Sequence, residues 1–184
     1  MDFGISGRTA LVRGPKDDLG EACRQALERE GVRVVGALEP DVDIIVSHLP
    51  VPCGPALLDV VSAEGLHDVW NAVVDAVGAY RDALPAMAAR AWGRLVWVGS
   101  AAAKSLDAAD DELGAVVSLA MMAAHKVIAS EVGPSRITAN AVLGGGQATP
   151  DDIAAAVAFF CSEGAAYLSG VTVSVDGGAG SAVY

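Results

Sequence analysis

Two glycines, Gly14 and Gly20, stand in a turn that joins a short apolar strand to a helix. The residue pattern predicts the strand over Thr9–Arg13 and the helix over Leu19–Glu30. In a turn of this kind, glycines let the backbone approach a pyrophosphate, and the first N–H groups of the helix can donate to its oxygens. The chemistry indicated here is dinucleotide binding, with Gly14 and Gly20 as candidate cofactor-binding residues.

The charges in this turn oppose that chemistry. Asp18 occupies the place of a middle glycine, and together with Asp17 it puts two negative charges where a diphosphate would lie. Lys16 offsets them only in part. The alternative is an ordinary strand–turn–helix with no ligand. Glu39 follows Gly20 by about 20 residues, the separation expected of an acidic residue that holds a ribose. Its alternative is a solvated loop glutamate.

Two further candidates follow predicted strands. His48 comes directly after the apolar run Val42–Ser47, and Ser100 comes directly after Arg94–Gly99. Because α/β folds bind ligands at the carboxyl ends of their strands, His48 and Ser100 are the candidate catalytic residues. A role as a loop or helix-cap residue is the alternative for Ser100.

Other ionisable residues have simpler interpretations. His125 and Lys126 fit the polar side of a packed helix, whereas Asp110, Asp111 and Glu112 fit a solvated loop. No pair has the spacing of a metal site, a nucleophile with its base, or paired catalytic carboxylates. No metal is therefore expected.

Composition limits the classes of function. The 184 residues, 53% of them hydrophobic, suffice for one domain with a sizeable core. A net charge of −11 without a basic stripe argues against a nucleic-acid partner. No apolar run reaches about 18 residues, and no secretory signal is visible, so we expect no membrane span. The three separated cysteines, Cys23, Cys53 and Cys161, indicate thiols in a reducing cytoplasm.

The elements that position these candidates alternate along the chain. Strands are predicted over 9–13, 32–37, 42–47, 94–99, 137–142 and 171–175, and helices over 19–30, 56–90, 113–131 and 150–161. This alternation predicts one Rossmann-like α/β domain over residues 1–184, with a doubly wound parallel sheet.

One connection is too short for an ordinary parallel crossover. Only residues 38–41 separate the strands predicted over 32–37 and 42–47, whereas a crossover between paired parallel strands needs a dozen or more residues. Even fully extended, the chain from Leu38 to Asp43 spans only about 17 Å. We therefore expect either unusually short strands or irregular pairing at this place.

Several stretches, taken in order, resemble the short-chain dehydrogenase/reductase (SDR) family. The opening strand is similar at 7–12, the strand that carries the family's serine at 93–100, and the sixth-strand region at 131–142. The closing segment is similar at 148–154, 167–170 and 175–178. The resemblance implies the family's fold, an NAD(P) cofactor, oxidoreductase chemistry, and assembly through the long helices that match 56–90 and 113–131.

The sequence also departs from the family pattern. The family's Tyr-x-x-x-Lys pair moves the proton, and the resemblance places these two positions at Gly114 and Ser118, neither of which can do so. The run 47–50 replaces an Asn-Asn-Ala-Gly motif. A strand–helix unit between the family's second and fourth strands is missing, and so is the substrate-covering segment, between Gly146 and Thr149.

Two hypotheses follow from these departures. The first is a homologue without catalytic activity that acts as a regulatory subunit or as an oligomerisation partner of an intact relative. The alternative is a working enzyme, either an NAD(P)-dependent oxidoreductase or a repurposed acid–base enzyme, with a non-standard active site. A pocket lined by both His48 and Ser100 would favour the second.

Overall fold

One parallel sheet organises the chain. The computed structural model describes residues 2–48, 63–105 and 112–181. Its strands are β1 (Thr9–Arg13), β2 (Arg33–Val35), β3 (Ile44–His48), β4 (Gly93–Ser100), β5 (Ile137–Gly144) and β6 (Thr172–Val175). They lie in the order β2-β1-β3-β4-β5-β6, and every neighbouring pair is parallel. The predicted α/β fold with a parallel sheet is confirmed.

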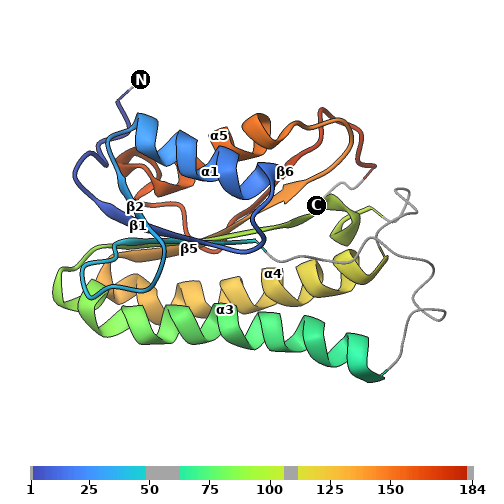
Figure 1. Ribbon diagram of the computed structural model, residues 1–184, viewed down its shortest axis with the longest axis horizontal. Helices are drawn as coiled ribbons and strands as arrows, with labels where there is room; N and C mark the ends of the chain where they lie inside the picture. The colour runs from blue at the N-terminus through green and yellow to red at the C-terminus, as the bar shows by residue number, and fades with distance from the viewer. Residues whose placement is uncertain (1, 49–62, 106–111, 182–184) are drawn as a thin grey trace.

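Helices cover both faces of this sheet (Figure 1). Helices α1 (Asp18–Arg29) and α5 (Pro150–Cys161) pack on one face, and α3 (Ala63–Ala89) and α4 (Glu112–Val132) on the other. Each of the first two begins at a side-chain cap. Asp17 accepts a hydrogen bond from the Gly20 N–H, and Thr149 forms a reciprocal capping box with Asp152. Residues 56–62 of the predicted helix 56–90 lie outside the described residues.

The alternation of each strand decides which side chains meet which helices. In β1, Ala10 and Val12 pack with α1 and α5, whereas Leu11 packs with α3. In β3, Ile45 lies on the α3 side and Val46 on the α1 side. Because both faces are covered, the central strands read as continuous apolar runs.

Helix α4 is apolar enough to pass a test for membrane spans. The segment Gly114–Ser135 could cross a membrane by length and composition alone, which the sequence analysis did not predict. Within the fold, its residues Val117, Met121 and His125 are buried against the sheet. Core helices of soluble proteins pass the same test, so this observation is weak support for a membrane span.

The short connection at 38–43 has a regular explanation. Strands β2 and β3 do not pair with each other but flank β1 on opposite sides, each in regular parallel register. Strand β2 is only three residues long, so the chain travels only a short distance from the carboxyl end of β2 back to the amino end of β3. Of the two expectations, the short strand is confirmed, and the irregular pairing is wrong.

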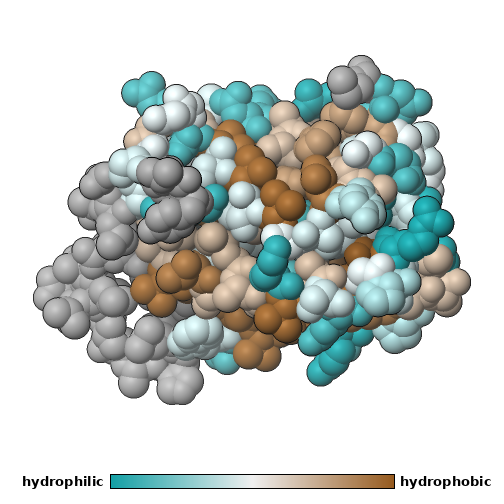
Figure 2. All heavy atoms as spheres, turned by 180° about the vertical axis from the view of Figure 1, so that it is seen from behind, coloured by the Kyte–Doolittle hydropathy of each residue, from teal (hydrophilic) through white to brown (hydrophobic). Residues whose placement is uncertain are grey.

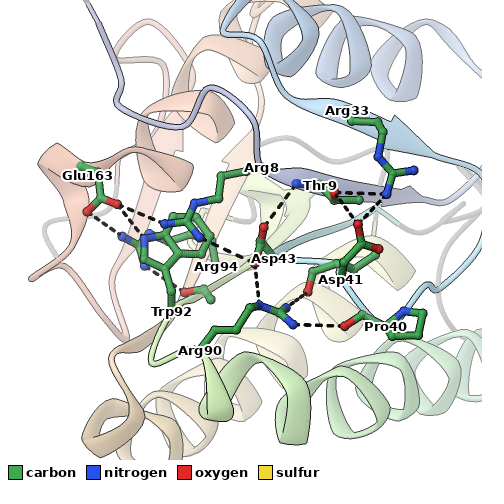
Figure 3. Close-up of polar contacts among 12 residues, drawn as sticks. Arg8, Thr9, Arg33, Pro40, Asp41, Asp43, Arg90, Trp92, Arg94 and Glu163 are labelled. Carbon is green, nitrogen blue, oxygen red and sulfur yellow. Dashed lines mark hydrogen bonds and ion pairs between the residues drawn. The ribbon is translucent and has the colours of Figure 1, made fainter.

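An ionic network fixes this connection at the amino ends of the strands (Figure 3). Arg33 pairs with Asp41 at 2.7 Å, and the Arg90 Nε donates to Asp43 at 3.0 Å. Nearby, the guanidinium groups of Arg8 and Arg94 lie 3.9 and 4.2 Å from the centre of the Trp92 ring. The amino edge is therefore closed by side chains of the protein itself.

Candidate functional site

His48 and the two glycines of the turn meet at the carboxyl ends of β1 and β3. A methyl carbon added to Gly20 would lie 2.8 Å from His48 Nε2, and one added to Gly14 would lie 2.6 Å from the same atom. Gly14 also has a φ of +144°, which favours glycine. The structure thus brings three sequence candidates together, and packing against His48 explains the need for both glycines.

The first turn of α1 is occupied by a carboxylate of the chain. Asp17 Oδ1 accepts the Gly20 N–H at 2.9 Å and lies 3.8 Å from His48 Nε2. A dinucleotide's phosphate would use the N–H groups of this turn. Burial lowers the pKa of His48, and the negative charge of Asp17 opposes this shift only in part. His48 is therefore neutral near pH 7 and offers little charge to a phosphate.

A large open pocket lies beside this turn, with a volume of about 1630 Å³. One wall is the glycine turn with His48, and another is the middle of α3, from Val73 to Asp82. Three of its arginines are engaged by the protein. Arg13 donates to the Asp75 carbonyl, Arg24 to the Val12 carbonyl, and Arg81 pairs with Asp82. The pocket therefore offers few uncommitted cations to an anionic ligand.

The structure does not bring Glu39 to this pocket. Its carboxylate pairs with Arg33 at 3.0 Å, within the ionic network at the amino edge of the sheet. Gly36, Ala37 and Leu38 line the pocket at the end of β2 instead. Glu39 is thus held by an ion pair, and its predicted contact with a ribose stays a prediction.

Ser100 also lies apart from the pocket, whose lining includes His48 but not Ser100. The Ser100 hydroxyl accepts the Ala102 N–H at 3.2 Å and caps a short 3-10 helix, Ala101–Ala103. Its backbone N–H donates to the Ser118 hydroxyl at 2.9 Å. The geometry fits the helix-cap alternative, and this pocket does not bring His48 and Ser100 together.

The two positions that the sequence resemblance assigns to the family's tyrosine and lysine lie on α4, and the second of them, Ser118, contacts β4. Gly114 and Ser118 are both buried. A methyl carbon added to Gly99 would lie 2.5 Å from the Ser118 hydroxyl, so strand and helix approach as closely as small side chains allow. This contact holds the Ser118 hydroxyl against the backbone of β4.

The remaining sequence candidates have structural positions. His125 is buried, and its pKa is lowered to about 4, chiefly by desolvation. Lys126 is exposed and donates to the Gly170 carbonyl. Asp110 and Asp111 lie outside the described residues, as does the side chain of Glu112. Within the described ranges, no cluster of three or more His, Cys, Asp or Glu residues could hold a metal ion.

Two parts of the site, Arg13 and the α3 wall of the pocket, were not predicted from the sequence. Arg13 is a charged residue that ends an apolar strand, which is a signal for a side chain at a site edge. The wall could not be found in this way, because it joins β1 to residues about 60 positions later in the chain.

Comparisons with known proteins identify the fold. No protein-family profile and no curated protein sequence matches the chain. Among solved structures, the TT0495 protein from Thermus thermophilus superposes with a TM-score of 0.82 at 23% identity, covering 93% of this chain and 98% of that one. A mutant short-chain dehydrogenase/reductase from Serratia marcescens superposes with a TM-score of 0.75 at 22% identity, covering 95% of this chain and 98% of that one. A putative oxidoreductase from Escherichia coli superposes with a TM-score of 0.75 at 20% identity, covering 94% of this chain and 97% of that one.

These likenesses define the class of fold. The chain has a Rossmann-like α/β fold of the short-chain dehydrogenase/reductase type, as the sequence resemblance implied. At identities below 25%, the likeness concerns the fold, and the activities of these proteins do not carry over to this chain.

Proposed function

We propose that this protein is a non-catalytic homologue with the SDR fold, acting as a regulatory subunit or assembly partner. Its partner would be a second copy of the chain or an intact relative. One observation carries the proposal. The positions of the proton-transfer pair are the buried Gly114 and Ser118, and Ser118 is committed to the Ser100 backbone. General acid–base chemistry beside Ser100 would need an ionisable side chain there.

Among the described residues, one tyrosine lies in the protein core, and it does not replace the missing one. Tyr80 is 1% exposed and does not line the pocket. Desolvation raises the pKa of Tyr80 further from neutrality, and this rise is only partly opposed by Ser47 and Arg13. A general acid needs a pKa nearer the working pH and access to substrate.

The glycine turn supports the same proposal. Asp17 already occupies the Gly20 N–H, and the arginines around the pocket bond to protein acceptors. A phosphate would therefore have to displace a carboxylate and approach Asp18 as well. Each of these steps lowers affinity for NAD(P).

An exposed apolar face supports assembly. On α4, Val116, Leu119 and Val127 are 42%, 56% and 57% exposed, and on α3, Trp70 and Val74 are 45% and 66% exposed. The spacing on α4 places its three residues on one side of the helix.

On the face seen from behind, hydrophobic side chains lie among polar ones (Figure 2). The buried free thiols of Cys23 and Cys161 fit a cytoplasmic location.

Calorimetric titration with NADH and NADPH tests whether the protein has lost the ability to bind the cofactor. We expect no saturable binding up to millimolar concentrations. The double variant Asp17→Ser with Asp18→Gly keeps a capping side chain, removes two charges and restores the middle glycine. Tighter binding by this variant than by the wild type would support the electrostatic argument. Micromolar binding by the wild type would contradict the proposal.

Sedimentation velocity tests the assembly face. If the partner is a second copy, the wild type sediments as an oligomer, and Leu119→Glu or Val127→Glu shifts it towards the monomer. Leu38→Glu is the matched control, because Leu38 is also exposed but lies on the connection after β2. A wild-type monomer at every soluble concentration would contradict self-assembly. The other possible partner, an intact relative, is tested by mixing it with the wild type and, separately, with Leu119→Glu. Co-sedimentation with the wild type but not with the variant would support it.

An NAD(P)-dependent oxidoreductase with a non-standard site is the second candidate. The observation that favours it is the large open pocket at the carboxyl ends of β1 and β2, beside a turn that keeps Gly14 and Gly20. Saturable cofactor binding followed by turnover of a carbonyl substrate would establish this function instead.

A further inference from the structure

Four buried side chains between the sheet and helices α3 and α4 carry polar atoms that lack a hydrogen-bond partner. These atoms are Ser47 Oγ, Tyr80 Oη, Trp97 Nε1 and His125 Nε2. The four residues are at most 1% exposed. A buried polar atom without a partner costs about 1–3 kcal/mol, so four in one region would be a large penalty for one domain.

The four side chains lie in one group. The ring centres of Tyr80 and His125 are 5.5 Å apart, edge to face, and those of Trp97 and His125 are 6.4 Å apart. Ser47 is the register partner of Trp97 across β3 and β4. Ser47 also lies close enough to the Tyr80 hydroxyl to oppose in part the rise in the pKa of Tyr80, although neither hydroxyl has a partner at ordinary hydrogen-bond geometry.

The donors and acceptors of this group are complementary but do not meet directly. His125 Nδ1 lies 2.9 Å from the Met121 carbonyl, which can only accept, so Nδ1 carries the proton. Because burial keeps this imidazole neutral, Nε2 is left as an acceptor. The Trp97 indole can only donate, and the Ser47 and Tyr80 hydroxyls can do both. A small molecule that donates and accepts would satisfy all four side chains.

We propose that these side chains form a binding site for internal water. At least one water molecule accepts from Trp97 Nε1 and donates to His125 Nε2, and the hydroxyls of Ser47 and Tyr80 complete its shell. Buried waters in proteins typically make two to four such bonds to polar groups that would otherwise be unsatisfied. Because the four residues come from β3, β4, α3 and α4, this water ties both helices to the sheet.

This site is separate from the pocket at the glycine turn. None of its four residues lines that pocket. The proposal also stands without the proposed function, since it rests on the interior of the fold and not on the assembly face or the cofactor turn.

Proton NMR tests the proposal on the wild-type protein. The indole N–H of Trp97 should show a cross-relaxation signal to a long-lived water molecule. Trp92 is the internal control, because its indole already donates to Glu163 at 2.7 Å. A water signal at Trp97 and none at Trp92 is the expected result. No water signal at Trp97 would overturn the proposal.

The variant Tyr80→Phe gives an independent test through the sign of its effect. If the hydroxyl binds the internal water, its loss should raise the unfolding equilibrium constant about tenfold. If the hydroxyl is dry and unpartnered, its removal should leave the protein equally or more stable, which would overturn the proposal. Tyr167→Phe is the matched control, because Tyr167 is fully exposed and should show no change.

Discussion

The imidazole of His48 lies where a side chain on Gly20 would have to stand. His48 is 3% exposed, so it has little freedom to move away from the turn. The same ring also contacts the space above Gly14. At the scale of single residues, the two glycines that suggest a phosphate cradle are equally required by a histidine from the neighbouring strand.

Gly20→Ala should therefore destabilise the protein by about 1–3 kcal/mol, because the new methyl group overlaps His48 Nε2. The cost should fall clearly in the background of His48→Ala, where the imidazole is absent. Urea denaturation of the wild type, both single variants and the double variant measures this coupling. Gly36→Ala is the control, since a methyl carbon there meets nothing within 4 Å. An equal cost of Gly20→Ala in both backgrounds would contradict the assignment.

His125 should make stability depend on pH. Its pKa is about 4 in the folded protein, against an ordinary value of 6.5. Between these values the unfolded chain binds more protons than the folded protein, so stability falls as the pH drops from about 6.5 to 4. The full effect amounts to about 3 kcal/mol. Burial of His48 acts in the same direction.

Chemical denaturation at several pH values measures this dependence. His125→Gln should make the unfolding free energy depend less on pH over the same range. The pH dependence that remains would come from His48 and the carboxylates. A wild type and variant with parallel curves would show that His125 does not titrate in this range.

The sequence predicted part of this site. It named Gly14, Gly20 and His48 separately, and strand–helix alternation was enough to put them at one edge of the sheet. It could not predict their contact, because His48 is about 30 residues from either glycine and side-chain packing is not visible in a single sequence. Glu39 is a different case. Its separation from Gly20 fits a ribose contact, which stays a prediction, whereas its ion pair with Arg33 could not be predicted from the spacing.

At the scale of elements, small residues control how closely α4 approaches β4. Gly99 and Ser118 lie close together, so the Ser118 hydroxyl reaches the Ser100 backbone. A methyl group on Gly99 would overlap that hydroxyl, so strand and helix could not stay this close with a larger residue at Gly99.

Gly99→Ala tests this close approach. The added carbon would lie 2.5 Å from Ser118 Oγ and 2.6 Å from Trp97 Nε1, so we expect a loss of about 1–3 kcal/mol in unfolding free energy. Gly78→Ala, in α3, is the matched control, because its methyl group meets nothing within 4 Å. There the better helix propensity of alanine should stabilise the protein by up to about 1 kcal/mol. Thermal unfolding should show a lower melting temperature for Gly99→Ala and an equal or higher one for Gly78→Ala. A Gly99→Ala variant as stable as the wild type would contradict the close packing of α4 against β4.

Most elements were predictable because their signals are local. Thr149, Pro150 and the two aspartates that follow mark the start of α5, and the structure confirms that start. Strand lengths were less predictable. The run 32–37 is β-branched, yet only Arg33–Val35 pair in the sheet, since the chain must turn back towards β3 at once. Boundaries of this kind depend on the tertiary connection and not on local propensity.

At the scale of the whole molecule, stability should be unevenly distributed. Strands β4 and β5 have eight residues each and pair along their full length. Strand β2 has three residues and, within the part of the chain that the structure describes, pairs on one side only, next to the open pocket. Short edge elements with few buried contacts open more readily than a central core.

Native-state hydrogen exchange should show this gradient. We expect the amides of β4 and β5 to exchange only through global unfolding, and those of β2 to exchange about a hundredfold faster or more. Measurement in the presence of NADH provides a control, because cofactor binding would slow exchange at the glycine turn. Equal protection in β2 and β5 would mean that the sheet opens as one cooperative unit.

The Asp17 cap has a consequence for any attempt to give this fold a cofactor. Its carboxylate is tethered three residues from the N–H that it occupies, so it competes with a dissolved phosphate as an intramolecular ligand. A tethered competitor acts at a fixed effective concentration, which short flexible links put at about millimolar or above. Dilution of the protein leaves that competition unchanged. Engineering of dinucleotide affinity would therefore have to begin at Asp17, before any residue is placed to touch the nicotinamide or the substrate.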